Sequence, residues 1–220
     1  MLAEKLIVQE LPSLKPSDNG DTALRWMDDY KVTNLCVVNE GVFLGTISED
    51  NVLNMNDVGE AISTVKETFN HSFVRKDQHV FEAVKVINED HLTVVPVLDA
   101  KDNYLGCISI SQMMKVIANL PMANHPGAIL VLELSIHNYS LQAIAGIVEE
   151  NNARILGTFI ASSDDSSKLQ LTLKLNKTDI GTIISSLQRH DYEIVYFENN
   201  ESDQEDMLDR FDSLMNYLNV

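Results

Sequence analysis

Two short motifs of equal spacing contain the side chains in this sequence that are best suited to binding chemistry. Both follow the pattern Gly-x-x-Ser-x-x-amide, one in the run LGTISEDN and one in the run LGCISISQ, and together they comprise Gly45, Ser48, Asn51, Gly106, Ser109 and Gln112. Serine hydroxyls and side-chain amides donate and accept hydrogen bonds. Each serine also lies where a β-like segment gives way to a helical one, which favours a helix N-cap. The motifs therefore predict two helix starts with hydrogen-bonding chemistry.

The spacing of the reactive side chains does not match that of a catalytic or metal site. Asp28-Asp29 and Asp164-Asp165 are neighbours in sequence, a placement typical of solvated charge, and the six histidines lack metal-ligand spacing. Glycine-rich phosphate loops, Gly-x-Ser-x-Gly and His-Glu-x-x-His are absent from the sequence. We therefore expect a protein that is not an enzyme, with no catalytic residues, no metal and no cofactor. A hydrolase or transferase with an unrecognised site is the alternative, and nucleotide turnover would reveal it.

The segments that precede the two motifs repeat as well. Ala23, Leu24 and Met27 lie sixty positions before Ala83, Val84 and Ile87, and residues 35–38 lie sixty before residues 95–98. The offset becomes sixty-one at the motif glycines, so one residue is inserted in a turn. Each copy is expected to form a helix, two strands and a second helix. In the first copy these lie at 22–30, 34–38, 42–47 and 48–55. In the second they lie at 80–88, 93–98 and 104–108, with a last helix that begins at Ser109 or Ser111 and ends at 119.

Single residues refine this expectation. Asp21 is the expected N-cap of the first helix. Pro96 lies inside a strand-like run and lacks an amide donor, so its nitrogen should face away from a neighbouring strand. Cys36 and Cys107 lie in hydrophobic segments and are expected to be buried free thiols.

The doubled pattern, with Gly-x-x-Ser opening the second helix of each copy, resembles a tandem pair of CBS domains over roughly the first half of the chain. This resemblance implies duplicated β-α-β-β-α units, here residues 1–121 with copies at about 1–60 and 61–121. It also implies that adenosine-containing nucleotides bind in the clefts between the copies. In that family the motif serine or threonine and the acid three residues later hold phosphate and ribose hydroxyls. The candidate nucleotide-binding residues are therefore Gly45, Ser48, Asn51, Gly106, Ser109 and Gln112.

The amides at the acidic position of the motif modify that expectation. Asn51 and Gln112 lack the charge that strengthens a hydrogen bond, and Gln112 has more rotamer freedom to lose. We therefore expect weak binding, preferentially in the cleft of Ser48 and Asn51. The cations near the motifs are few, with Arg25, Lys31 and Lys76 as candidates. A compact monophosphate such as AMP should suit the protein better than a triphosphate.

Net charge limits the classes of partner. The chain has 16 Lys and Arg against 33 Asp and Glu, a formal charge of −17. Phosphate backbones and anionic membranes attract concentrated positive charge, so we expect neither nucleic acid nor membrane as a partner. The sequence has no apolar run of eighteen residues, and Glu4, Lys5 and Glu10 interrupt the first ten residues, so we expect a cytoplasmic protein.

The second half of the chain has a different pattern. Residues 120–127 have the composition of a linker. After them we expect strands at 128–136, 154–161, 168–175 and 192–198, with helices at 140–151 and 179–190. The order βαββαβ predicts a ferredoxin-like α+β fold with both helices on one face of the sheet.

This half, residues 122–200, resembles an ACT domain, a regulatory module that often binds amino acids at dimer interfaces. The ligand loop of that family corresponds here to His137, Asn138 and Ser140. Ser140 stands where the family has a glycine, whose missing Cβ allows close approach of a ligand, and this argues against amino-acid binding. A CBS pair followed by an ACT-like domain resembles the acetoin-utilisation (AcuB-like) CBS-ACT regulatory proteins.

The remaining residues, 201–220, are expected to form an acidic C-terminal amphipathic helix. Ser202-x-x-Glu205 is a capping-box pattern, and six apolar residues between 207 and 218 recur at helical spacing. This stripe either packs on its own domain or docks across a subunit interface.

Two functions follow from these patterns and resemblances. The first is a regulatory ligand sensor that binds an adenosine nucleotide and signals through the arrangement of its domains or subunits. The second is an oligomeric interaction scaffold with degenerate pockets. In both we expect a homodimer, because the family commonly pairs and the tail offers apolar surface. The protein target remains open.

Overall fold

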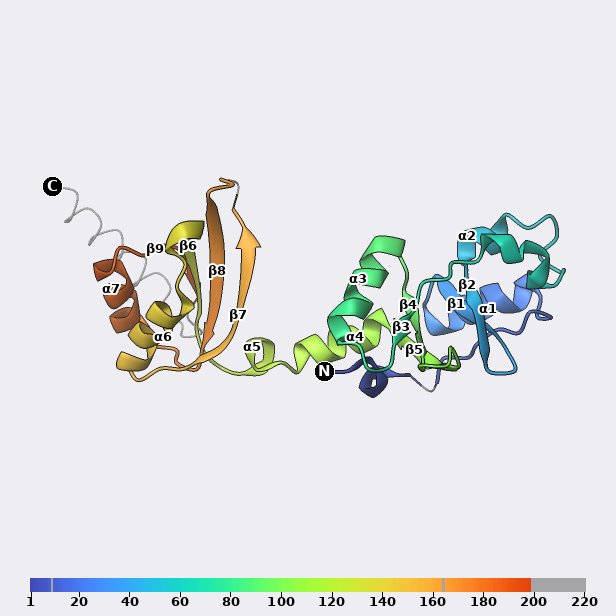
Figure 1. The fold of residues 1–220 in the computed structure, drawn as a ribbon, viewed down its shortest axis with the longest axis horizontal. Helices are drawn as coiled ribbons and strands as arrows, with labels where there is room; N and C mark the ends of the chain where they lie inside the picture. Colours follow the sequence, from blue (N-terminus) through green and yellow to red (C-terminus); the bar gives the residue numbers. More distant parts are fainter. Residues whose placement is uncertain (9, 164, 199–220) are drawn as a thin grey trace. The chain divides into compact units, whose positions relative to one another are not determined.

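The computed structural model describes residues 1–8, 10–163 and 165–198 of the 220-residue chain. The chain divides into two compact units, residues 1–117 and 118–220 (Figure 1). The expected C-terminal helix at 201–220 lies outside the described residues.

The first copy of the repeat has the expected elements. They are α1 (Gly20–Tyr30), β1 (Asn34–Asn39), β2 (Val42–Ser48) and α2 (Glu49–Leu53), with β1 and β2 paired as an antiparallel hairpin. The N-cap of α1 is Asn19, whose side chain accepts a hydrogen bond from the Thr22 amide, and the expected cap Asp21 lies in the first turn. This correction moves the helix start by two residues. Asp21 still lies in the first turn, where its negative charge interacts favourably with the helix dipole.

The second copy contains β3 (Val74–Arg75), α3 (Val80–Asp90), β4 (Val94–Leu98), β5 (Tyr104–Ser109) and α4 (Ile110–Ala118). Its sheet has the order β3-β4-β5, with β3 parallel and β5 antiparallel to β4. The β-α-β-β-α order is therefore complete here. In the first copy the initial strand is reduced to a single parallel bridge between Leu14 and Val37. A 3-10 helix, η2 (Ile62–Thr68), connects the two copies.

Pro96 lies in β4, the central strand of this sheet, and its nitrogen faces away from one of the two neighbouring strands, β5. It lies opposite Cys107 in β5, and the carbonyl of Cys107 accepts a hydrogen bond from the Val8 amide on the other side of β5. Because the N–H and C=O of a strand residue point to the same side, Pro96 and Cys107 form a non-hydrogen-bonded pair of the antiparallel ladder. The missing donor of Pro96 therefore costs no hydrogen bond to β5.

The segments that precede each copy pack into the other copy. The 3-10 helix η1 (Ala3–Leu6) contributes Ala3 and Leu6 to the core of the second copy. Ile62 and Phe69, which precede the second copy, belong to the core of the first. The ranges 1–60 and 61–121 thus describe the repeat in the sequence. In the folded unit, the segment before each copy packs in the core of the other copy.

Two buried thiols lie where the copies meet. Cys36 and Cys107 are free and fully buried, as the sequence predicts, and both belong to the core cluster of the first copy. A hydrogen bond with Cys107, together with burial, raises the pKa of Cys36. Tyr104 packs against the same cluster, and its burial raises its pKa as well. Cys36 and Tyr104 therefore remain uncharged at the junction, whereas the hydrogen bond with Cys36 lowers the pKa of Cys107.

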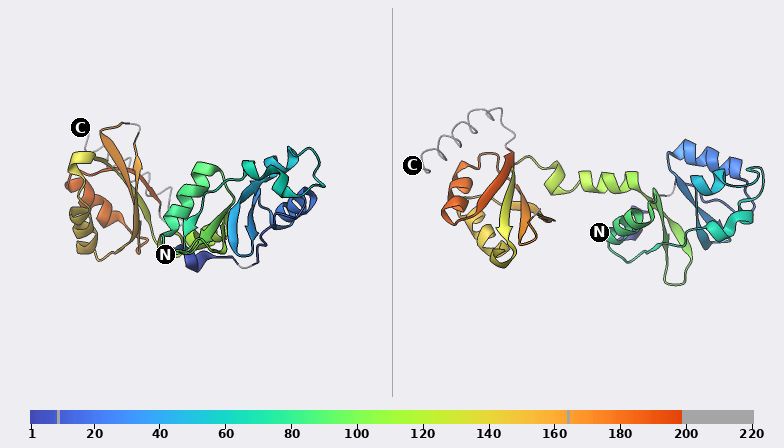
Figure 2. Two further views of the ribbon diagram at one scale, coloured as in Figure 1. Left: turned by 45° about the vertical axis from the view of Figure 1, so that its right-hand side comes forward. Right: turned by 90° about the horizontal axis from the view of Figure 1, so that it is seen from above.

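The second unit forms a four-stranded antiparallel sheet in the order β7-β8-β6-β9. After the short α5 (Pro121–Asn124) come β6 (Ile129–Ser135), η3 (Ile136–Asn138), α6 (Leu141–Glu150), β7 (Ile155–Ser162), β8 (Lys168–Leu175), α7 (Gly181–Arg189) and β9 (Glu193–Glu198). The outer strands β7 and β9 flank the pair β8 and β6, which is the ferredoxin-like order. Figures 1 and 2 show α6 and α7 on the same side of this sheet.

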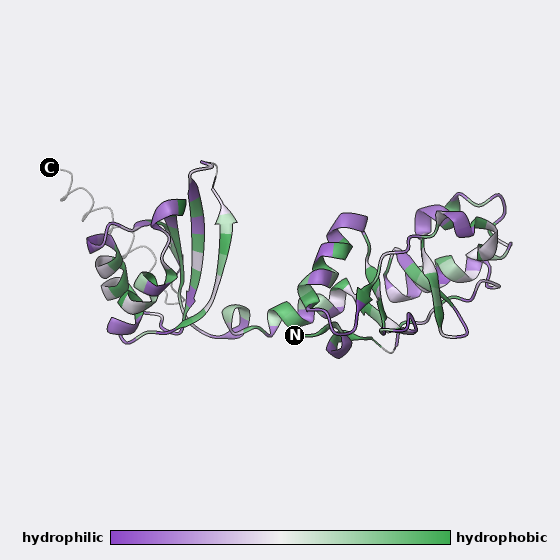
Figure 3. Cartoon of the chain, viewed as in Figure 1, coloured by the Kyte–Doolittle hydropathy of each residue, from purple (hydrophilic) through white to green (hydrophobic). Residues whose placement is uncertain are grey.

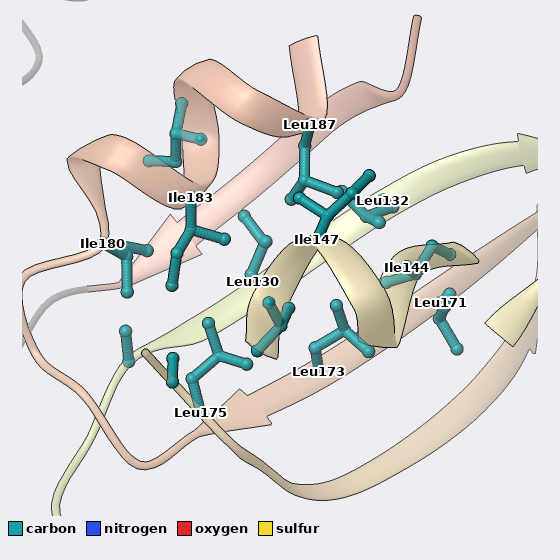
Figure 4. Packing of buried hydrophobic residues seen from close by; sticks show 14 of the residues in the cluster. Leu130, Leu132, Ile144, Ile147, Leu171, Leu173, Leu175, Ile180, Ile183 and Leu187 are labelled. Carbon is teal, nitrogen blue, oxygen red and sulfur yellow. The ribbon is translucent and has the colours of Figure 1, made fainter. Parts of the chain in front are cut away.

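One face of the sheet forms the core of this unit. The even-numbered leucines of β6 and the odd-numbered leucines of β8 are buried against α6 and α7 (Figure 4). The strict alternation in β8 appears as bands of hydropathy along the strand (Figure 3). A strand with period two and two helices with period 3.6 thus share one apolar layer. Within the part of the chain that the structure describes, no helix is both long enough and apolar enough to cross a membrane.

Candidate functional site

The first unit contains two cavities that the repeat relates to one another. The larger, about 740 Å³, is lined by residues 30–32 at the end of α1 and by residues 109–112 at the start of α4. We call it the Ser109 cleft. The smaller, about 420 Å³, is lined by residues 90–92 at the end of α3 and by residues 48–50 at the start of α2. We call it the Ser48 cleft.

Each cleft combines the motif of one copy with the first helix of the other. Residues 30–32 and 90–92 are sixty positions apart, and residues 48–50 and 109–111 are sixty-one apart, which are the offsets of the sequence repeat. The two clefts are therefore internal counterparts. Positions that correspond between them can be compared directly.

Charge differs between the two clefts at these corresponding positions. Lys31 in the Ser109 cleft corresponds to His91, and Ile110 and Ser111 correspond to Glu49 and Asp50. The Ser109 cleft has Lys31 and Lys115 against Glu10, whereas the Ser48 cleft has Glu49, Asp50 and Asp90 and no lysine or arginine among the described residues that line it. Phosphate groups are attracted to the first arrangement and repelled by the second.

The side chains of the first motif bond to one another. The hydroxyl of Ser48 accepts a hydrogen bond from the backbone N–H of Asn51 at 3.1 Å and donates one to Asn51 Oδ1 at 2.6 Å. Asn51 Oδ1 also accepts from the Ser48 amide at 3.3 Å, which completes a capping box at the start of α2. Ser48 lines its cleft, but Asn51 does not. The oxygen of Asn51 that would accept a ribose hydroxyl is thus occupied by the helix cap.

In the second motif the serine caps the helix but the side-chain amide does not take part in the cap. Ser109 Oγ accepts a hydrogen bond from the backbone N–H of Gln112 at 3.2 Å and lies 2.8 Å from Ser111 Oγ. The side chain of Gln112 does not return to the cap, and Ser109, Ser111 and Gln112 all line the Ser109 cleft. Two residues with hydroxyls and one with a side-chain amide therefore line the same cavity as Lys31.

Lys31 is held at the mouth of this cleft by its own helix. It ends α1 in a left-handed conformation, with φ 56°. Its Nζ atom lies 2.7 Å from Asp28 Oδ1, and this hydrogen bond raises the pKa of Lys31. The lysine is therefore charged at neutral pH. The other two cations proposed from sequence, Arg25 and Lys76, line neither cleft.

The motif glycines have a backbone role. Gly45 and Gly106 adopt φ values of +145° and +138° beside register shifts of the two hairpins, and neither lines a cleft. A Cβ on Gly45 would lie 2.7 Å from Phe69 Cβ, and one on Gly106 would overlap the side chain of Ile7. The glycines thus allow the preceding segments to cross the hairpins closely.

Sequence reasoning missed Tyr30, Lys115 and Glu10 as residues of the Ser109 cleft. Tyr30 on α1 and Glu10 in the N-terminal segment are far from the motif in sequence. Lys115 lies on α4, one helical turn beyond Gln112. The signal that can find the α1 residues is the repeat itself, because the end of each first helix faces the opposite motif. No local sequence pattern indicates that the N-terminal segment lines this cleft.

The expected ligand loop of the second unit does not form a comparable site. Ser140 Oγ accepts from the Ala143 amide at 3.3 Å and caps α6, and the Ser135 hydroxyl accepts from the His137 amide at 3.4 Å. The cavities described in this unit, of about 630 and 610 Å³, are lined by other residues than His137, Asn138 and Ser140. Within the described residues, no group of three or more His, Cys, Asp or Glu is placed to hold a metal ion.

A comparison with protein families identifies part of the first unit. Residues 62–119 match the model of the CBS domain. This range contains β3, α3, β4, β5, α4 and the second motif. The first copy has the corresponding helix, hairpin and motif-capped helix, so the unit 1–117 has the fold of a CBS domain pair.

Solved structures similar to the chain include other CBS pairs. A CBS domain pair/ACT domain protein from Thermotoga maritima is 20% identical, with 53% of this chain and 96% of that chain covered and a TM-score of 0.48. CBSX2 in complex with AMP is 21% identical, with 53% and 95% covered and a TM-score of 0.46. The CBS domains of a transcriptional regulator from Streptococcus pneumoniae are 18% identical, with 52% and 98% covered and a TM-score of 0.45.

Proposed function

We propose that the CBS pair is a non-catalytic regulatory module that binds a compact adenosine nucleotide, such as AMP, in the Ser109 cleft. The observation that carries this proposal is the opposite charge of two clefts that the repeat makes otherwise equivalent. Lys31 and Lys115 line one, and Glu49, Asp50 and Asp90 line the other. A phosphate-bearing ligand therefore distinguishes between them.

The choice of cleft differs from the one that residue types alone favour. Asparagine is the better of the two amides for a ribose hydroxyl, but Asn51 is engaged in its capping box and lies outside the cavity. In the Ser109 cleft, Ser109 and Ser111 provide hydroxyls near the start of α4, where helix amides favour anions. We therefore place the nucleotide with its phosphate toward these groups and Lys31.

Charge reversal at Lys31 tests the proposal. We expect Lys31→Glu to weaken AMP binding by at least about ten-fold, because it removes a cation and adds an anion beside the phosphate. Adenosine, which has no phosphate, should bind with little change. Isothermal titration calorimetry with both ligands measures the two affinities.

The corresponding position of the other cleft provides a matched control. His91 also ends its helix in a left-handed conformation, with φ 53°, and lines the Ser48 cleft. His91→Glu should leave AMP affinity unchanged. A loss confined to His91→Glu would place the nucleotide in the Ser48 cleft. No binding of AMP, ADP, ATP or S-adenosylmethionine to the wild-type protein, tested also by thermal shift, would favour the scaffold function.

We propose in addition that the protein is a homodimer that pairs through the second copy. The inward faces of α3 and α4 pack in the core, yet their outward faces are also apolar, with Phe81 68%, Met114 56% and Ile117 44% exposed. The corresponding positions of the first copy are Asp21, Leu53 and Asn56. Exposed apolar side chains on both helices of one copy are typical of an interface.

Met114→Glu is expected to convert the dimer to a monomer, because a charge would be buried in the interface without a partner. Sedimentation equilibrium at tens of micromolar measures the change. The matched control is Leu53→Glu, at the corresponding exposed position of the first copy, 59% exposed, which should leave the dimer intact. A monomeric wild-type protein would rule out the proposal, and dissociation by Leu53→Glu alone would place the interface on the first copy.

For the second unit we propose an ACT-like regulatory role without amino-acid binding at the 137–140 loop. The ferredoxin-like strand order supports the likeness to ACT domains. The cap formed by Ser140 supports the absence of a ligand, since the position is filled by a side chain that holds α6. With the CBS pair before it, this arrangement resembles that of the acetoin-utilisation CBS-ACT proteins.

A further inference from the structure

The N-terminal segment forms one wall of the Ser109 cleft. Ile7, Val8, Glu10 and Leu11 all line it. The Val8 amide donates to the carbonyl of Cys107 at 2.8 Å, on the second copy, and the Leu14 amide donates to the carbonyl of Cys36 at 2.8 Å, on the first. The segment is thus anchored on both sides of the cleft. Glu10 and Leu11, which lie between the two anchors, are therefore held at the cavity.

Glu10 is the acidic residue among those that line this cleft. Its side chain forms no hydrogen bond or ion pair among the residues that the structure describes. A carboxylate accepts hydrogen bonds through two oxygens and donates none at neutral pH. At the acidic position of the motif the same cleft has Gln112, which is neutral. The negative charge of this cleft is therefore that of Glu10, which lies outside the motif.

The charges of the cleft orient a nucleotide. A phosphate is attracted to Lys31 and Lys115 and repelled by Glu10, so a nucleotide bound in this cleft would turn its nucleoside end toward Glu10. At that end the 2′ and 3′ hydroxyls are adjacent donors whose spacing suits the two oxygens of one carboxylate. Hydrogen bonds to an ionised acceptor are about twice as strong as neutral ones.

We propose that Glu10 binds the ribose hydroxyls and makes the Ser109 cleft selective for ribonucleotides over deoxyribonucleotides. This inference rests on the proposed function of the cleft. It assigns to an N-terminal residue the acceptor that the motif lacks at Gln112.

Calorimetry with AMP and 2′-deoxy-AMP tests the inference. The wild-type protein should bind AMP about ten-fold more tightly than 2′-deoxy-AMP, the effect of one charge-assisted hydrogen bond. In Glu10→Gln the affinity for AMP should fall until it equals the affinity of the same variant for 2′-deoxy-AMP. The matched control is Glu4→Gln, an exposed acid of the same segment that does not line the cleft, which should keep the wild-type ratio.

The possible outcomes separate this inference from the proposed function. If Glu10 only repels phosphate, Glu10→Gln will bind AMP more tightly and keep the ratio, which overturns the inference and leaves the site intact. If Glu10 contacts the adenine amine instead, both ligands will weaken equally, which also overturns it. Loss of the ratio in Gln112→Ala but not in Glu10→Gln assigns the ribose to Gln112. A wild-type protein that binds neither nucleotide overturns the proposed function and the inference together.

Discussion

Asn34→Leu is expected to destabilise the CBS pair by about 4 kcal/mol, because the Asn34 amide joins the two copies. Asn34 is 2% exposed at the start of β1. Its Oδ1 accepts from the Thr93 amide at 2.7 Å and the Val94 amide at 3.1 Å, and its Nδ2 donates to the Val94 carbonyl at 2.9 Å. Leucine has similar volume but leaves these backbone groups without partners, at about 1–3 kcal/mol for each buried group.

The loss can be measured by urea unfolding followed through Trp26, the one tryptophan of the chain, which packs against the core of the first copy. Asn88→Leu is the matched control, since Asn88 is exposed on α3. It should change the unfolding free energy by less than about 0.5 kcal/mol. Equal effects of the two substitutions would show that the copies do not depend on the Asn34 contacts.

Gly127→Ala is expected to destabilise the second unit by about 4 kcal/mol, the sum of a steric overlap and a strained backbone. Gly127 precedes β6 and has φ +150°. A Cβ there would overlap the carbonyl oxygen of Leu175 and lie 3.3 Å from the Cα of Asn176. Both are backbone atoms of the neighbouring chain segment, so no side-chain rotation relieves the overlap.

Hydrogen exchange of peptides from β8 measures the effect within this unit, because β8 is a central strand of its sheet. Gly146→Ala is the control of opposite sign. Gly146 lies inside α6, and a methyl group added there would meet no described atom of another element within 4 Å, so alanine should stabilise by about 0.5–1 kcal/mol. Unchanged exchange of β8 in Gly127→Ala would contradict the prediction.

Patterns that depend on neighbouring residues were predictable from the sequence. The alternating leucines of β8 indicate a strand with one buried face, and the motif serines indicate helix caps. The sixty-residue offset indicates a duplicated unit. The helix cap at Asn19 was displaced from the expected Asp21, because several polar residues in that stretch are suitable caps and the choice depends on where the chain enters the helix.

The candidate site followed only in part from the motifs. Ser109 and Gln112 line the larger cleft as their motif suggests, but Asn51 does not line the smaller one. A capping box and a ligand contact use the same side-chain oxygen. Sequence alone does not say which of them the folded chain forms.

By itself the sequence determined the repeat, the order of the longer helices and strands of both halves and the burial of Cys36 and Cys107, since these follow from local periodicity and apolar runs. The short elements β3 and α5 were not expected. Only the tertiary structure decided how the segments before each copy are exchanged, which side chains meet at Asn34, and which charges line each cleft. These depend on contacts between residues far apart in the sequence, such as Asn34 with Val94 and Val8 with Cys107. Such contacts arise when packing brings the end of one copy's first helix to the motif of the other, and with it Lys31 to Ser109.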